Sequence, residues 1–310
     1  MQIVLAIIFE SVRSALELAL FILLPIMVTM LAVMKVLQAK GVLDFVARGL
    51  SPVMKVFGVS GLSVIAALQQ LFVSFAAPPT TLAMMVQKKL PPREIAATLA
   101  MVMAMSQANA TFPLTALGLN LWVTWLTSVV GGLAAAALTY YLLFPGPDEE
   151  APSPSEELEA SGPGQGWMRT ALDGAREGVQ LVLKSLPVIL VAVLAVNVLA
   201  AVGALKLLES MLTPVMQQIG LSGVAIVPIV TKYLAGGTAM MGVTLDLIRE
   251  GSFDAPALNR IAGATINPLD PVGLAVLAPA VAKTPNVLRP AVLGALAGIV
   301  IRGILHLILF

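Results

Sequence analysis

Long apolar stretches alternate with short polar segments along most of the chain. Runs of more than about 18 apolar residues are typical of membrane-spanning helices. In each half the pattern predicts a spanning helix, a short amphipathic helix, an apolar stretch broken near its middle, and two further helices. Their approximate bounds are 14–38, 42–57, 61–88, 93–116 and 118–143, then 178–202, 204–219, 223–249, 256–280 and 285–309. We therefore expect an all-α integral membrane protein.

The two halves share an internal repeat. "SPVMKVFGVSG" starts at Ser51, and "TPVMQQIGLSG" starts at Thr213. Proline, glycine and asparagine recur in the same order in both halves of the chain, whereas chance similarity between apolar helices yields scattered Leu and Ala matches. The matched pairs are Pro25 with Pro187, Gly41 with Gly203, Gly58 with Gly220, Gly61 with Gly223, and Asn109 with Asn267. We predict a first repeat over 1–144 and a second over 177–310.

An acidic segment separates the repeats. The sequence "FPGPDEEAPSPSEELEASGPGQGW" carries six acidic residues and no basic ones, with many Pro, Ser and Gly. Such a composition cannot bury enough apolar surface to fold and is typical of flexible linkers. We therefore predict a linker over 145–176.

Flanking charge predicts how the broken stretches lie in the membrane. Two arms of about 13 residues reach roughly 20 Å each, which is short of the ~30 Å hydrocarbon core. Basic residues flank 61–88 on both sides, so both ends lie on the cytoplasmic face and the stretch is a re-entrant hairpin. Its basic flanks are Lys35, Lys40, Arg48, Lys55, Lys88, Lys89 and Arg93; the flanks of 223–249 hold Lys206, Glu209, Arg249, Glu250 and Asp254. We expect two inverted-topology repeats in the cell inner (plasma) membrane, with the linker in the cytoplasm.

The composition limits the kinds of binding and catalytic site that the chain can form. The formal net charge is +1, so no overall field favours nucleic acid, and the chain has no cysteine and one histidine. Metal sites and cofactors are therefore not expected. "GVSG" around Ser60 matches the serine motif of rhomboid-type proteases, but Ser222 repeats it and His306 is poorly placed as a base. We interpret both serines as helix caps and expect no enzyme.

The hairpin tips predict a binding site. Two prolines interrupt "SFAAPPTT" (Ser74–Thr81), and two glycines interrupt "KYLAGGTAMMG" (Lys232–Gly242). Unwound backbone at membrane depth must be buried in protein or line a wet cavity, and helix ends there attract polar or anionic solutes. The candidate substrate-binding residues are Gln69, Gln70, Ser74, Thr80, Thr81, Asn109, Thr111, Thr231, Lys232, Gly236, Gly237, Thr238, Asn267 and Asp270.

Four of these residues carry alternatives. Asn109 and Asn267 are each followed by prolines in mid-helix, and two interpretations of them stay open. Their amides bind a solute, or they only join the break to the facing hairpin. Lys232 and Asp270 are the only charges expected near the midplane, where an unpaired charge costs about 2.5–3.5 kcal/mol or more, so we predict that they pair. The pair either stays closed and only stabilises the fold, or it opens during transport.

Six motifs form a pattern shared by the two halves: "SPVMKVFGVSG", "SFAAPPTT" and "SQANATFP" in the first half, with "TPVMQQIGLSG", "LAGGTAMMG" and "ATINPLDP" in the second. In these motifs the chain resembles the nucleoside recognition, or Gate, domain. Relatives of that type include concentrative nucleoside transporters, the membrane part of ferrous-iron transporters, and spore maturation proteins. The resemblance implies a central site at Ser74–Thr81, Asn109, Gly236–Thr238 and Asn267. The pore cysteine and GTP-binding domain of the iron transporters are missing, as are acidic residues at the tips.

Two functions remain open. The leading hypothesis is a secondary transporter of a small polar or anionic metabolite, nucleoside-like or an organic acid, by alternating access. Coupling to a proton or Na+ would use Asp270 as the carrier. The alternative is a non-transporting membrane scaffold or subunit, with the breaks as structural kinks. The amphipathic helices suit contacts in a homo-oligomer.

Overall fold

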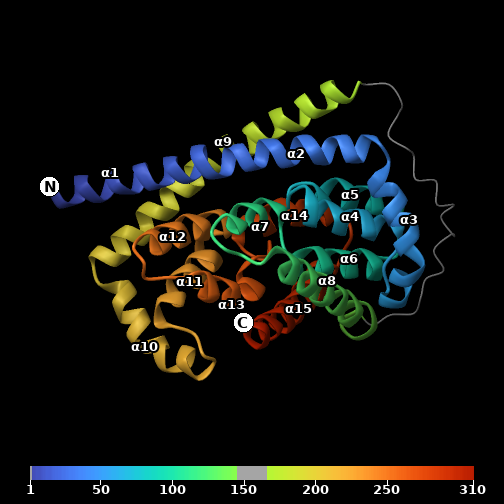
Figure 1. Cartoon of the computed structure of the whole chain (residues 1–310). Helices are drawn as coiled ribbons and strands as arrows, with labels where there is room; N and C mark the ends of the chain where they lie inside the picture. Colours follow the sequence, from blue (N-terminus) through green and yellow to red (C-terminus); the bar gives the residue numbers. More distant parts are fainter. Residues whose placement is uncertain (1, 145–165) are drawn as a thin grey trace.

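The computed structural model describes residues 2–144 and 166–310, and within these residues every regular element is a helix (Figure 1). The first half holds α1 (Gln2–Glu17), η1 (Leu18–Leu23), α2 (Leu24–Ala39), α3 (Val42–Met54), η2 (Lys55–Phe57), α4 (Gly61–Phe72), α5 (Pro78–Gln87), α6 (Pro92–Ala104), α7 (Ala108–Thr115), α8 (Leu121–Leu138) and η3 (Thr139–Leu143). The second half holds α9 (Trp167–Ala201), α10 (Ala204–Gln218), η4 (Gly223–Ala225), α11 (Ile226–Ala235), α12 (Gly237–Arg249), α13 (Ala255–Thr265), α14 (Pro271–Val281) and α15 (Leu288–Leu309). The predicted all-α fold is confirmed.

The first helices of the two halves pack along each other. α1, η1 and α2 form one long helix, and α9 runs beside it on one side of the molecule (Figure 1). Gly174 and Gly178 allow the close approach, because a Cβ there would lie 2.4 Å from the Leu31 oxygen and 2.8 Å from the Val28 Cα. An ion pair of 3.0 Å between Lys35 and Glu177 joins the same two helices.

The helix α9 corrects the predicted end of the linker. We expected flexible chain up to residue 176, but α9 begins at Trp167. Residues 167–176 lack proline and continue the helix that the packing of Gly174 on α2 stabilises. Residues 145–165 of the predicted linker lie outside the described residues, so the linker's cytoplasmic placement stays a prediction.

The core forms around α6 and α7. Every residue from Ile95 to Leu114 is buried, and α8 and α15 pack against α6. α8 and α15 approach each other through small residues, since a Cβ on Gly298 would lie 2.4 Å from the Gly131 oxygen. Small residues at a helix crossing are the usual means of close packing in membranes.

The pairing of elements follows the order of the two halves. α2 packs on α9 and α8 on α15, while α5 contacts α14 and α7 contacts α12. The amphipathic helices α3 and α10 lie on opposite sides of the core (Figure 1). This arrangement agrees with two inverted repeats, although inversion in a bilayer stays a prediction.

The exterior suits lipid. Four helical stretches in the described residues are long and apolar enough to span a membrane: Ile7–Ala39, Pro92–Thr115, Leu121–Leu143 and Leu288–Leu309. Ser210–Gln218 and Gly223–Ala235, bent by 109° at the break between them, are long and apolar enough only when taken together, as a broken span or a re-entrant loop. Large apolar side chains face outward, among them Phe21 at 77% and Trp122 at 75% exposure. Hydrocarbon, rather than water, is the solvent that accommodates such a surface.

Candidate functional site at the helix breaks

The first hairpin turns back on itself between α4 and α5. Thr81 Oγ1 donates to Gln69 Oε1 at 2.8 Å, whereas twelve residues of continuous helix would separate them by about 18 Å. Pro78 opens α5, a position where proline's fixed φ and missing N–H fit the helix start. The predicted break in 61–88 is confirmed, and its re-entrant placement in the bilayer stays a prediction. Ser60 is the N-cap of α4, as expected, and its N–H donates to Ser63 Oγ at 3.1 Å.

The second hairpin turns on one residue, Gly236, between α11 and α12. Its φ of 92° and ψ of 170° belong to a region that essentially only glycine occupies. Gly237 follows, and a Cβ there would lie 2.4 Å from Gln107 Nε2. The tip of the second hairpin therefore lies against the break of the first half's α6–α7 helix. The predicted break in 223–249 is confirmed.

Replacing Gly236 tests this turn. We expect Gly236→Ala to destabilise the protein by about 1–3 kcal/mol, because alanine is strained at this φ and ψ. Thermal unfolding in detergent measures the loss. Gly49→Ala is the matched control: Gly49 lies in α3, and a Cβ there meets nothing within 4 Å. An equal melting temperature for wild type and Gly236→Ala would contradict the assigned turn.

The break between α6 and α7 differs from the prediction. We expected it after Asn109, at the following proline, but Met105–Gln107 are the unwound residues and Pro113 lies inside α7. Met105 and Gln107 are extended, and the Ser106 N–H donates to Ser128 Oγ of α8 at 2.7 Å. The break is therefore fixed by a neighbouring helix rather than by proline.

Asn109 lies in the first turn of α7. It is 8% exposed, and its Oδ1 has no hydrogen-bond partner among the described residues. The same holds for Ser106 Oγ, and for both side-chain polar atoms of Gln70, which is fully buried. A buried polar group without a partner costs about 1–3 kcal/mol, so such groups call for an explanation.

Asn267 occupies the break between α13 and α14, where both of its polar atoms are used. Its Nδ2 donates to the Ala264 oxygen at 2.7 Å, and its Oδ1 accepts from the Leu269 N–H at 3.0 Å. Asn267 thus ties its own break together, and Tyr233 of α11, on the second hairpin, donates to the same Ala264 oxygen at 2.6 Å.

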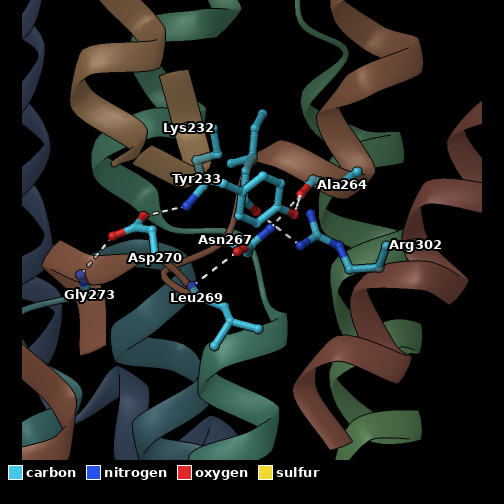
Figure 2. A network of polar contacts seen from close by, with 9 residues as sticks. Lys232, Tyr233, Ala264, Asn267, Leu269, Asp270, Gly273 and Arg302 are labelled. Atoms are coloured by element: carbon cyan, nitrogen blue, oxygen red, sulfur yellow. Dashed lines mark hydrogen bonds and ion pairs between the residues drawn. The ribbon is translucent and has the colours of Figure 1, made fainter. Parts of the chain in front are cut away.

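The predicted ion pair between Lys232 and Asp270 is confirmed. Lys232 Nζ donates to Asp270 Oδ2, with the two residues 0% and 5% exposed (Figure 2). Asp270 is also the N-cap of α14, accepting from the Gly273 N–H at 2.8 Å. Lys232 lies in the last turn of α11, so each charge stands at the helix end of opposite partial charge.

Arg302 is a third buried charge in this region, and we did not predict it. It extends from α15 toward Asn267 and Tyr233 (Figure 2) and is 0% exposed. Its Nη1 donates to the Ala104 oxygen at 2.6 Å and to the Ile266 oxygen at 2.9 Å. Lys232 and Asp270 are therefore not the only charges buried near the helix breaks, while their depth relative to the membrane midplane stays a prediction. From the sequence, an arginine in the last helix is interpreted as a residue that flanks a membrane span. Its acceptors are backbone carbonyls, which every residue carries, so the sequence does not identify them.

The remaining candidate residues divide by burial. Thr80 is exposed and Thr238 is partly exposed, whereas the other candidates are buried. Thr111 and Thr231 donate to carbonyls of the preceding turn, at Gln107 and Val227. Ser74 Oγ accepts from the Ala76 N–H. The structure thus brings together Gln69 with Thr81, and Gly236 and Gly237 with Lys232, Asp270 and the unpredicted Gln107.

Within residues 2–144 and 166–310 no group of three or more His, Asp or Glu is arranged to hold a metal ion. The polar groups at the breaks are amides, hydroxyls, backbone ends and the three charges. Groups of these kinds donate and accept hydrogen bonds.

Comparison with known families decides the assignment. The family model described as "Gate: Nucleoside recognition" matches residues 20–122 and 182–287, which is more than half of the chain. The chain belongs to the nucleoside recognition (Gate) family. The matched residues include both hairpins and both broken helices of this Gate protein. A comparison with functionally curated proteins gave no significant match.

Solved structures of the concentrative nucleoside transporter CNTnw share the fold. An outward-facing variant is 19% identical over 92% of this chain and 74% of its own, with a TM-score of 0.70. The inward-facing, substrate-bound structure is 18% identical over 93% and 73%, with a TM-score of 0.73. An intermediate state is 18% identical over 92% and 75%, with a TM-score of 0.72. At these identities the likeness establishes the fold of the Gate protein and leaves its solute open.

Proposed function

We propose that this Gate protein is a secondary transporter of a small polar metabolite, a nucleoside-like compound or an organic acid. The observation that carries the proposal is the set of unpaired, buried polar groups at the breaks: Gln70, Ser106 Oγ and Asn109 Oδ1. Inside a membrane protein such groups need water or a solute, and transporter sites are formed by interrupted helices near the midplane. The fold shared with a nucleoside transporter supports the same reading.

The hydrogen-bonding groups favour a neutral or anionic solute. The helix N-termini of α7 and α12 have no side-chain cap, whereas α5 begins with Pro78 and Pro79, which carry no N–H. No acidic side chain other than Asp270 stands among the candidate residues. Free backbone N–H groups at helix starts bind electron-rich oxygens. Asp270 is already bound by Lys232 and Gly273, so coupling through Asp270 would require the ion pair to open.

A scaffold role is the second candidate, and the second half of the site favours it. Asn267 and Asp270 use their polar atoms within the protein, as the members of a static kink would. The two candidates separate at Gln70 and Asn109, because a scaffold has no use for unpaired buried amides.

Uptake by purified protein in liposomes tests the proposal. We would measure uridine, adenosine, succinate and glutamate, each with and without an inward Na+ or proton gradient, against protein-free liposomes. Saturable uptake of one class supports transport, and dependence on one gradient identifies the coupling ion. No uptake of any class above the protein-free control would favour the scaffold.

A further inference from the structure

Arg302 contacts both interrupted helices at once. Ala104 is the last residue of α6, and Ile266 is the C-cap of α13, so both hydrogen bonds of Nη1 end on carbonyls at helix C-termini. The last carbonyls of a helix have no partner within it, and a basic side chain is one of the groups that satisfy them. One helix comes from each half of the chain.

The charges at this point balance. Each helix C-terminus carries roughly half a negative elementary charge, so two of them offset about one positive charge. In the described part of the chain no carboxylate forms an ion pair with Arg302, while Asp270 is bound by Lys232. The two helix ends therefore take the place of a counter-ion at Nη1 of the fully buried guanidinium, while Nε and Nη2 have no hydrogen-bond partner among the described residues.

Glycines make room for this side chain. A Cβ on Gly131 of α8 would lie 2.3 Å from Arg302 Cγ, and a Cβ on Gly263 of α13 would lie 2.3 Å from the Arg302 oxygen. The aliphatic part of the Arg302 side chain thus occupies the space that a side chain at position 131 of α8 would fill. Nη1 reaches the ends of α6 and α13 because three helix backbones approach closely here.

We propose that Arg302 is a positioning residue that sets both helix breaks together. By capping the carbonyl ends of α6 and α13 it holds open the two unwound segments, 105–107 and 266–270, that form the candidate site. Its loss loosens both segments, although they lie in different halves of the chain. This inference concerns the geometry of the breaks and does not depend on which solute is carried, or on whether one is.

Hydrogen exchange on the full chain in detergent tests the inference without a transport assay. Reporter amides lie in both breaks: the Ser106 N–H bonds Ser128 Oγ, and the Leu269 N–H bonds Asn267 Oδ1. A hydrogen bond from a charged group is worth about 1.5–3 kcal/mol, which corresponds to a tenfold or larger change in opening. We expect Arg302→Gln to speed exchange at least tenfold in both segments, with the hairpin tip at 73–77 unchanged.

His306→Leu is the matched control. His306 lies one turn further along α15, is 0% exposed, and contacts Thr127 Oγ1 at 2.8 Å and the Asn259 oxygen at 2.6 Å. We expect exchange in both breaks to stay near the wild-type rate in this variant. Equal acceleration by His306→Leu would overturn the inference, as would an Arg302→Gln protein in which either break exchanges at the wild-type rate.

Arg302→Lys covers the case in which Arg302→Gln does not fold. Lysine keeps the charge but is one heavy atom shorter, so its nitrogen cannot reach both carbonyls. We expect faster exchange in at least one break. Wild-type exchange in both breaks of Arg302→Lys would overturn the inference. Failed uptake by wild-type protein would count against the proposed function only.

Discussion

Lys232→Met is expected to destabilise the protein by about 3–5 kcal/mol, because it leaves the Asp270 carboxylate buried without its cation. Asp270→Asn is expected to cost a similar amount by stranding the ammonium, while the Asn side chain can still cap α14. The double variant should recover at least half of either loss, since no uncompensated charge remains. Unfolding in denaturant, followed in detergent for all four proteins, measures the coupling.

The control for this cycle is the ion pair between Lys35 and Glu177, whose side chains are 37% and 40% exposed. Pairs of that kind contribute about 0–1 kcal/mol, so Lys35→Met should shift stability far less. If the double variant were no more stable than the less stable of the two single variants, energetic coupling between Lys232 and Asp270 would be refuted. The cycle also bears on function, because a pair that opens during transport must not be too strong to break.

Gln70→Leu is expected to abolish uptake while leaving the protein as stable as wild type or more so. Both polar atoms of Gln70 lack partners in the described residues, so removing them relieves a buried polar cost of about 1–3 kcal/mol. A residue that serves only the fold does not behave in this way. Thermal unfolding and liposome uptake, measured on the same preparation, separate the two effects.

Gln69→Leu is the matched control for that prediction. Gln69 is the neighbouring residue of the same type and is also buried, but its Oε1 accepts the 2.8 Å hydrogen bond from Thr81. Its replacement should lower stability by about 1–3 kcal/mol, because Thr81 loses its link across the hairpin. If Gln70→Leu lost as much stability as Gln69→Leu, or kept full uptake, the assignment of Gln70 to the solute path would be wrong.

The two hairpin breaks could be predicted from sequence because the residues that cause them lie in them. Pro78 suits the first position of a helix, and Gly236 adopts a backbone conformation that other residues avoid. The pairing of Lys232 with Asp270 was predictable for a related reason: a charge in an apolar stretch needs a partner, and few were available.

The break at Met105–Gln107 could not be placed in this way. Its residues carry no proline or glycine, and what holds it open is Ser128 Oγ on α8 and Arg302 on α15. Those partners lie 22 and 198 residues away along the chain, and one of the acceptors is a backbone carbonyl. The end of the linker was misplaced for a similar reason, since α9 is extended to Trp167 by packing on α2.

The central claim is that the unwound backbone at the breaks faces a solute path that opens to water. The chain has no cysteine, so single cysteines can be introduced without altering the background. Ser106→Cys probes the break, and Ala135→Cys probes the dry packing of α8, with both positions 0% exposed in this structure. In sealed membranes, a charged thiosulfonate reagent should label Ser106→Cys and leave Ala135→Cys unlabelled. The solute that gives uptake should slow that labelling. A Ser106→Cys protein as unreactive as Ala135→Cys would contradict the account.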